Sequence, residues 1–397
     1  MHAAHIDSCP IGYGRQDIRD EDVDAVVRVL RADLLTQGPA LAAFEDGLTE
    51  ASGAAHAVAV SSGSGALQLG MAALGVGPGS IVITSANTFL ASATAALWCG
   101  AEVEFVDIDP DTLNFDLDAL EARLARGPVD AVVAVHFAGL PCDMERLANL
   151  KRRFGFKLVE DACHAFGGSF AYGDGMLRVG ELADVDATIL SFHPVKLLTT
   201  GEGGAVLTHD ADVAARVRQL RHHGLVRDSA ARPFASSTDC PPWFSPMSEL
   251  GGNFRLSDLG AALGSSQLTR LAASIASRRE QAQRYDDAFE QGRLPGLMPP
   301  PRQTGHAWHL YVLRCEHDER DALMAYLDER RIGTQLHYYP VPMQPYFSER
   351  YGTVSVPQAE RHARRALSIP LYPGLALSDQ VRVIQALEEW CKERGQG

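Results

Sequence analysis

Residues 80–109 read SIVITSANTFLASATAALWCGAEVEFVDID and contain the pattern that decides the fold. Two short runs rich in β-branched residues, 80–86 and 102–109, flank an alanine-rich stretch at 89–100. Runs of the first kind predict strands, and the stretch between them predicts a helix. Because strand–helix–strand units place their strands side by side in a parallel sheet, this stretch predicts an α/β fold.

The alternation of strand-like and helix-like runs continues on both sides of this unit. Further strands are expected at 56–63, 129–137, 156–162, 187–194 and 204–209, and further helices at 67–75, 116–126 and 143–155. Such a chain forms a mostly parallel sheet covered by helices, and ligands bind beyond the carboxyl ends of its strands. Several expected strands end in polar residues, namely Ser61, Ser62, Asp107, His136, Asp161 and the segment from Ser191 to Lys196.

The remainder of the chain predicts a second, smaller domain. Residues 228–252 show no period and are rich in Pro, Ser and aromatic residues, so we expect an ordered functional flap there. One helical segment is expected over 256–291, and strands and helices alternate from 306 onward. For 397 residues two domains are the natural expectation, and we place a large domain at 1–250 and a small α+β domain at 251–397.

Composition excludes several function classes. The net charge of −14 argues against non-specific binding to nucleic acid, because phosphates would be repelled. No run of about 18 apolar residues occurs, so no membrane span is expected. The N-terminal residues lack a basic region followed by an apolar core, and the seven cysteines are scattered without a CxxC pair. These features predict a cytoplasmic protein with reduced thiols.

Lys196 is unusual among the four lysines of the chain, which are Lys151, Lys157, Lys196 and Lys392. It follows the apolar run ATILSF and precedes a glycine-rich turn, whereas the others lie in polar surroundings. Most lysines are solvated at the surface. A lysine that is partly removed from water instead becomes a better nucleophile and suits Schiff-base chemistry. Both interpretations of Lys196 remain open at this point.

Asp161 ends the expected strand KLVED and also has two interpretations. It could be the N-cap of a short helix over the following residues. It could equally be a carboxylate that holds a cationic ring nitrogen, which pyridoxal phosphate requires in order to act as an electron sink. A partner lysine at the end of a neighbouring strand, such as Lys196, is what that chemistry would need.

The segment SSGSGALQLGMAALG at 61–75 passes from a strand end into a helix. Backbone N–H groups at a helix start, together with serine hydroxyls, form a site suited to phosphate, although Ser and Gly also cap helices without a ligand. The segment contains no GxGxxG pattern, so a nicotinamide oxidoreductase is the lesser alternative.

Aromatic and histidine side chains raise two further possibilities. Phe89 opens an expected helix, and its ring could pack in the core or stack on a cofactor ring. His164, His193, His222 and His223 match no usual zinc spacing, and we expect no metal site.

Eight sequence blocks in order resemble the DegT/DnrJ/EryC1/StrS-type aminotransferases, fold type I enzymes that use pyridoxal phosphate and act on nucleotide-linked keto-sugars. These blocks are LTQGP (35–39), SSGSGAL (61–67), residues 88–109, VEDACHAFG (159–167), SFHPVKLLTTGEGG (191–204), residues 251–268, IGTQLHYYPV (332–341) and IPLYPG (369–374). The resemblance extends nearly from end to end. It implies a large domain with a mostly parallel seven-stranded sheet and a smaller C-terminal domain.

The resemblance also implies roles for individual residues. Lys196 would bond covalently to the cofactor, and Asp161 would pair with its pyridine nitrogen. His164 would lie by the 3-hydroxyl, and Phe89 would stack on the ring. The implied phosphate ligands are Gly63, Ser64 and Ser191, with Asn253 reaching the cofactor of the neighbouring subunit in a homodimer with shared active sites.

Within this family, the segment 191–204 is similar to enzymes that aminate C4 of the sugar. Other blocks are similar to the UDP-sugar enzymes of the pseudaminic acid and 4-amino-4-deoxyarabinose pathways. We therefore expect transfer of an amino group from glutamate to a UDP-linked 4-keto sugar, with His337, His193 and the flap as candidate sugar contacts. A different sugar nucleotide, a C3 aminotransferase and a non-catalytic relative that kept the fold are the alternatives. Cys163, where the family commonly has Ala, receives no interpretation.

Overall fold

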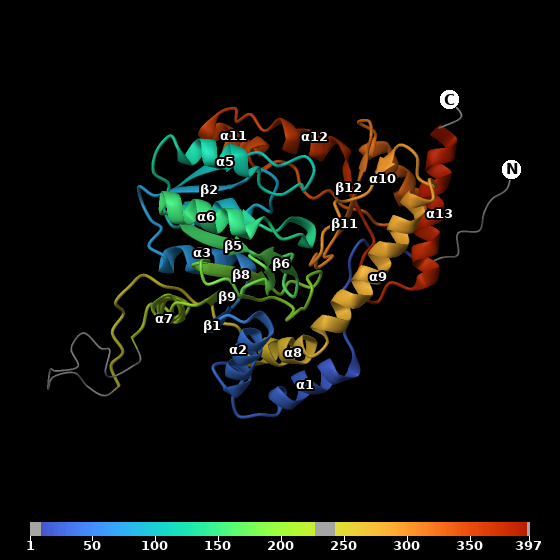
Figure 1. The fold of residues 1–397 in the computed structure, drawn as a ribbon. Helices are drawn as coiled ribbons and strands as arrows, with labels where there is room; N and C mark the ends of the chain where they lie inside the picture. Colours follow the sequence, from blue (N-terminus) through green and yellow to red (C-terminus); the bar gives the residue numbers. More distant parts are fainter. Residues whose placement is uncertain (1–8, 227–242, 395–397) are drawn as a thin grey trace.

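The seven-stranded sheet at the centre of the computed structural model, which describes residues 9–226 and 243–394, confirms the α/β prediction. Its strands are β1 (His56–Val60), β2 (Ile81–Ser85), β3 (Glu102–Val106), β4 (Ala131–Val135), β5 (Lys157–Asp161), β8 (Ala187–Ser191) and β9 (Gly204–Thr208). They lie in the order β1-β9-β8-β5-β4-β2-β3 (Figure 1). The neighbours from β3 to β8 pair in parallel, and β9 is antiparallel to both β8 and β1.

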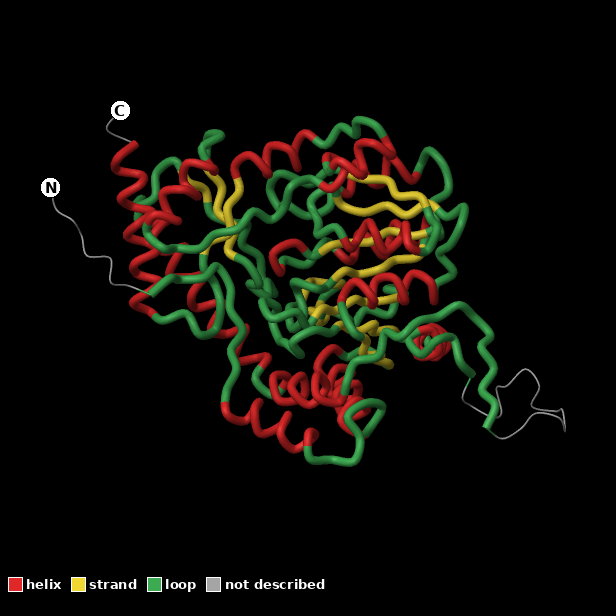
Figure 2. Tube along the Cα trace, turned by 180° about the vertical axis from the view of Figure 1, so that it is seen from behind, coloured by secondary structure: helices red, strands yellow, loops and turns green. Residues whose placement is uncertain are grey.

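Helices cover both faces of this sheet because its central strands are apolar on both sides. All five residues of β4 are buried, and the adjacent residues Val132 and Val133 of this strand belong to different hydrophobic cores. One core includes α2 (Pro39–Ser52), α5 (Leu117–Leu124) and α6 (Met144–Phe154), and the other includes α3 (Gly63–Ala73), α4 (Ala91–Trp98) and α7 (Ala211–Leu220). Figure 2 shows this layered arrangement from behind.

A small antiparallel sheet lies in the C-terminal part of the chain, as expected. It contains β10 (Leu297–Met298), β11 (Tyr311–Cys315) and β12 (Ala366–Ile369), and its residues contribute to two further cores, one with Tyr311 and Leu313 and the other with Val312. The helices of this part are α9 (Leu271–Glu290), α10 (Arg320–Glu329), α11 (Pro345–Tyr351), α12 (Pro357–Arg365) and α13 (Leu377–Arg394). None of the helices in the described ranges 9–226 and 243–394 is long and apolar enough to cross a membrane.

The boundary between the two predicted domains at 250/251 stays a prediction. Helix α8 (Asp258–Leu268) packs against α1 (Asp20–Leu30) and α2, so the first residues after this boundary lie beside the N-terminal helices (Figure 1). The short hairpin of β6 (Ser169–Tyr172) and β7 (Gly175–Arg178) was not expected from the sequence. Of the expected flap, residues 228–242 lie outside the described residues; in the described part, Val226 N–H donates to the Pro246 carbonyl at 2.9 Å.

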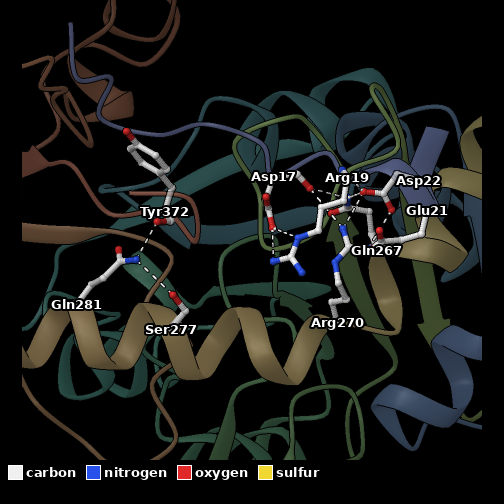
Figure 3. A network of polar contacts seen from close by, with 9 residues as sticks. All are labelled: Asp17, Arg19, Glu21, Asp22, Gln267, Arg270, Ser277, Gln281 and Tyr372. Carbon is white, nitrogen blue, oxygen red and sulfur yellow. Dashed lines mark hydrogen bonds and ion pairs between the residues drawn. The ribbon is translucent and has the colours of Figure 1, made fainter. Parts of the chain in front are cut away.

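The single helical segment expected over 256–291 is two helices, α8 and α9, which meet at Thr269 and Arg270. The Arg270 guanidinium pairs with Asp22 of α1 at 2.7 Å, and the Gln267 amide donates to the same carboxylate at 2.8 Å (Figure 3). Asp22 is fully buried. The helical pattern of apolar residues continues through this corner. A local pattern of this kind gives no information about the ion pair with Asp22, which lies far away in the sequence.

A buried polar network joins the residue after β4 to the neighbouring strands β5 and β8. The His136 imidazole Nε2 lies 2.8 Å from Glu160 Oε1, and the Thr188 hydroxyl donates to Glu160 Oε2 at 2.5 Å. The backbone N–H of Cys142 donates to His136 Nδ1 at 3.1 Å, so both ring nitrogens have partners. The side chains of His136 and Glu160 are fully buried.

Removing Glu160 should destabilise the protein strongly. Glu160→Ala leaves His136 and Thr188 buried without their acceptor, and we expect the free energy of unfolding to fall by about 3–5 kcal/mol in urea titrations. The matched control is Asp118→Ala, which removes an exposed partner of Arg146 and should leave the urea midpoint nearly unchanged. Equal losses in the two variants would contradict this account of the network.

Candidate active site

A cavity of about 400 Å³ lies at the carboxyl ends of the sheet strands, where the sequence predicts a ligand site. Its volume falls in the range of small-molecule pockets, about 300–1,000 Å³. Nine of the ten expected site residues line it, and these are Gly63, Ser64, Phe89, Asp161, His164, Ser191, His193, Lys196 and His337. Asn253 is not among its lining residues. Of the polar residues that the sequence places at strand ends, Ser62, Asp161, Ser191, His193 and Lys196 therefore share one pocket.

Lys196 is partly buried and lies in the turn that follows β8. Its backbone N–H donates to the His193 carbonyl at 2.9 Å, which closes the turn. Burial lowers the pKa of the Lys196 amine, while the nearby Cys163 and Asp161 oppose this shift. By contrast, Lys151 pairs with Asp186 at 2.6 Å and Lys157 lies 3.7 Å from the same carboxylate. Lys196 therefore lines the pocket from a partly buried turn, whereas Lys151 and Lys157 lie beside a carboxylate, and its covalent role stays a prediction.

Asp161 is the last residue of β5 and is only 6% exposed. Its Oδ2 accepts a hydrogen bond from the Ser92 hydroxyl at 2.7 Å, and its Oδ1 accepts from the Cys163 backbone N–H at 3.2 Å. The residues after Asp161 form turns and not a helix, so its interpretation as an N-cap is wrong. Ser92 lies on α4 and is itself 2.8 Å from the Thr88 hydroxyl. Neither hydroxyl residue was singled out from the sequence.

The start of α3 forms a concave wall opposite Ser191. Ser62 caps the helix, and its hydroxyl accepts from the Gly65 N–H at 3.0 Å. The first N–H groups of a helix have no partners within the helix. A Cβ on Gly63 would lie 2.8 Å from the Ser191 Cβ, so glycine is needed for the helix start to approach β8 this closely. The resulting surface of backbone N–H groups and hydroxyls suits an anion.

Aromatic side chains and histidines complete the pocket. Phe89 is 56% exposed, so it is not a core residue, and its ring centre lies 6.2 Å from that of Tyr338. His337 is buried, with Nδ1 2.7 Å from the Ser368 hydroxyl, whereas His193 is exposed. His164 is 5% exposed, and its Nδ1 has no hydrogen-bond partner among the described residues.

Several polar residues noted in the sequence, among them Asp107, His136 and Asn253, do not line the pocket. Asp107 accepts the backbone N–H groups of Gln358 and Ala359 at 2.8 Å each and thereby caps α12. His136 belongs to the buried network with Glu160. Asn253 is exposed and forms a β-bridge with His222, so its predicted contact with a neighbouring subunit stays a prediction.

Further pocket residues were missed by reasoning from the sequence. These are Tyr13, Thr88, Ser92, Glu202, His309, Gln335 and Tyr338, which come from five separate segments of the chain. Within residues 9–226 and 243–394, no group of three His, Cys, Asp or Glu side chains is arranged to hold a metal ion.

A model of the DegT/DnrJ/EryC1/StrS aminotransferase family matches residues 16–388, nearly the whole chain. The chain belongs to this family. It is therefore a sugar aminotransferase that depends on pyridoxal phosphate, and the family implies a keto-sugar as its substrate. The lysine, carboxylate and anion-binding wall found in one pocket agree with this assignment.

Several solved structures are similar over their full length. Helicobacter pylori PseC, an aminotransferase involved in the biosynthesis of pseudoaminic acid, is 27% identical with a TM-score of 0.87, covering 97% of this chain and 100% of PseC. DesV of S. venezuelae is 32% identical with a TM-score of 0.84, covering 97% and 99%. The PLP form of Spr1654 from Streptococcus pneumoniae is 26% identical with a TM-score of 0.85, covering 97% and 99%.

The buried His337 should make the stability of the protein without cofactor depend on pH. Burial, followed by Lys196 and His362, lowers the pKa of His337 to about 3. Because this lies below the value of about 6.5 in an unfolded chain, the unfolded state binds the proton first and stability is lost as pH falls below about 6.5.

Between pH 7.5 and 5.5, we expect the unfolding free energy of the wild type to fall by about 1.4 kcal/mol more than that of His337→Asn. Asparagine can keep the bond to the Ser368 hydroxyl but does not titrate. The measurement is a urea titration of both proteins without cofactor at the two pH values. Parallel pH dependences of wild type and variant would show that His337 takes up no proton on unfolding.

Proposed function

We propose that the protein transfers the amino group of glutamate to C4 of a nucleotide-linked 4-keto-6-deoxy sugar, with a UDP-sugar of the pseudaminic acid type as the first choice. The observation that carries this proposal is that Lys196 and Asp161, at the ends of the neighbouring strands β8 and β5, line one pocket. The similarity to PseC over 97% of the chain supports the choice of sugar, as does the segment 191–204.

The residues of the pocket fit pyridoxal phosphate. Asp161 would hold the protonated ring nitrogen, and the wall of Gly63, Ser64 and Ser191, which has no room for a Cβ at Gly63, would receive the phosphate. Phe89 would cover the ring face, and the buried Nδ1 of His164, which has no hydrogen-bond partner in the described part of the chain, would serve the 3-oxygen. When bound, the cofactor supplies an electron sink that stabilises negative charge on the carbon attached to the transferred nitrogen.

Lys196 acts in this scheme as both nucleophile and base. Burial lowers the pKa of its amine, which increases the neutral fraction that can attack a carbonyl carbon. The same Nζ can take the proton from the α-carbon of glutamate and later return a proton to the sugar carbon. Ser92 and the Cys163 backbone N–H donate to Asp161 and so keep its carboxylate oriented toward the pocket.

His193 and His337 are the proposed sugar contacts. His193 is exposed at the rim of the pocket, and His337 lies deeper, with its Nδ1 fixed by Ser368. Because the pKa of His337 is about 3, its imidazole is neutral and would recognise a sugar hydroxyl by hydrogen bonding instead of by charge. We also propose that the enzyme works in the cytoplasm, as the scattered cysteines of the sequence predict.

The enzyme is further proposed to be a homodimer in which each subunit completes the active site of the other. Asn253 does not line the pocket of its own chain, although the family resemblance gives it a phosphate contact. Phe89, which lines the pocket, is 56% exposed, and the large apolar side chains of Trp98 and Leu34 are also exposed, at 59% and 52%. Exposed apolar surface of this kind favours burial against a second copy.

The proposed reaction is tested with a panel of substrates. Purified holoenzyme is incubated with glutamate and UDP-, dTDP- or GDP-linked 4-keto sugars, and the product is located by NMR. We expect nitrogen at C4 with the UDP-sugar as the best substrate. Lys196→Ala should lose turnover by at least 10⁴-fold together with the visible absorption of the lysine-linked cofactor. Nitrogen at C3, or no transfer to any 4-keto sugar by a coloured wild type, would contradict the proposal.

The shared active site is tested with Asn253→Asp, which places a carboxylate beside the predicted phosphate. We expect sedimentation equilibrium to give twice the mass of one chain for both proteins. The variant should bind pyridoxal phosphate at least about tenfold more weakly, since a hydrogen bond to a charged group is replaced by repulsion. A monomeric wild type, or a variant that retains its cofactor fully, would exclude the shared site.

A further inference from the structure

Tyr338 is in direct contact with one of the proposed cofactor ligands. Its hydroxyl oxygen lies 3.1 Å from His164 Nε2, and the two rings are stacked with an angle of 25° between their planes. Tyr338 lines the same pocket as His164, although 174 residues separate them in the sequence. The hydrogen bond therefore brings two distant segments together at the active site.

Within residues 9–226 and 243–394, the two ring nitrogens of His164 have one hydrogen-bond partner between them. Nε2 faces Tyr338, whereas the buried Nδ1 has no hydrogen-bond partner among the described residues. Burial, followed by the charge of Lys196, lowers the pKa of His164 well below its usual range. The ring is therefore neutral and carries a single proton, on either Nδ1 or Nε2. Which nitrogen carries it decides whether Nδ1 can donate or only accept.

The hydroxyl of Tyr338 can determine which ring nitrogen of His164 carries the proton. Burial, followed by the charge of Asp161, raises the pKa of Tyr338 well above its usual range, so its hydroxyl keeps its proton. In the described parts of the chain, His164 Nε2 is the hydrogen-bond partner recorded for that hydroxyl. If the phenol donates to Nε2, its proton is satisfied and the imidazole proton must lie on Nδ1. In the opposite arrangement the phenol proton is left without an acceptor, and Nδ1 is a bare lone pair.

The position of Tyr338 is itself fixed by the surrounding structure. Its backbone N–H donates to the Asn87 side-chain oxygen at 2.9 Å. Its ring lies between Phe89 and Phe137, at centroid distances of 6.2 and 6.3 Å. The other titratable groups that line the pocket are Tyr13, Asp161, Cys163, His193, Lys196, Glu202, His309 and His337.

We propose that Tyr338 is a positioning residue whose hydroxyl donates to His164 Nε2, so that the imidazole presents an N–H at Nδ1 to the 3-oxygen of the cofactor. The inference rests on the cofactor placement given under the proposed function. A donor at this point is useful because the 3-oxygen carries negative charge that an N–H stabilises and a bare nitrogen lone pair repels. Tyr338 thus acts through His164 and not on the substrate.

The tautomer of His164 can be read directly in the protein without cofactor. In protein labelled with ¹⁵N-histidine, the chemical shifts of the two ring nitrogens distinguish the Nδ1–H and Nε2–H forms, and His164→Gln identifies the signals. We expect the Nδ1–H form in the wild type and a shift toward the Nε2–H form in Tyr338→Phe. An Nε2–H form in the wild type would overturn the proposal.

The second readout is the pH titration of visible absorption in the holoenzyme. Without the Tyr338 hydroxyl, His164 Nδ1 would donate less to the 3-oxygen of the cofactor. The 3-oxygen would then keep more negative charge, so the lysine-linked nitrogen would keep its proton to higher pH. We expect the absorbance midpoint to rise by about one pH unit in Tyr338→Phe, which corresponds to one hydrogen bond to a charged group. An unchanged midpoint would contradict the role of Tyr338.

Two controls separate positioning from a general effect on the pocket. Tyr13→Phe removes another hydroxyl that lines the cavity, from a ring 5.7 Å from His337, and should leave the midpoint in place. A glutamine at position 164 has no tautomers, so Tyr338→Phe should have no further effect on the midpoint in a His164→Gln background. Equal shifts in both backgrounds would overturn the proposal, whereas a wild type without any visible band would refute the proposed function itself.

Discussion

The close parallel pairing of β5 with β8 is the constraint on which the active site depends. Asp161 and Ile189 are partners in this register, so Asp161 ends β5 beside the strand that leads to Ser191 and Lys196. Both strands are buried on both faces, and a slip by one residue would exchange every side chain between the two cores. The register is therefore held by the hydrophobic cores, and the chemistry depends on packing far below the pocket.

Glycine at position 63 extends this constraint to the anion-binding wall. The order β1-β9-β8 places the start of α3 against the end of β8, with no space for a Cβ between Gly63 and Ser191. The wall and the carboxylate are thus set by the same strand, β8, which lies next to β5 on one side and close to the helix start at its end. Any cofactor that contacts both must lie across the carboxyl end of β8.

Much of the fold could be predicted from the sequence because the central strands are short, apolar runs bounded by turns. All seven expected strands were observed, and helix starts such as Asp143, whose side chain accepts from the Arg146 N–H at 2.9 Å, follow local capping rules. The break between α8 and α9 was not predicted; Arg270, at this corner, pairs with Asp22, which is 248 positions away in the sequence. A contact between residues so far apart in the sequence does not change the local spacing of apolar residues.

The residues of the candidate site likewise fall into those that could be predicted from the sequence and those that could not. Lys196 and Asp161 could be found because the ends of parallel strands converge in any sheet of this kind. Ser92 and Tyr338 could not, because their contacts with Asp161 and His164 join residues 69 and 174 positions apart. Asp107 also ends a strand, but its carboxylate caps α12 instead of facing the pocket. A strand-end position is thus neither necessary nor sufficient, since Ser92 lines the pocket from helix α4 and Asp107 does not line it.

Burial, more than net charge, determines the chemistry of this pocket. The chain carries a net charge of −14, yet the pocket-lining imidazoles of His164, His309 and His337 have lowered pKa values because they are removed from water. Neutral imidazoles next to Lys196 add no further positive charge, so its amine is influenced mainly by its own desolvation and by Asp161 and Cys163. A pocket of neutral donors and acceptors also makes proton position, and not charge, the property that its hydrogen bonds control. For this reason a single phenol such as Tyr338, which adds no charge at neutral pH, can alter how the pocket presents a donor.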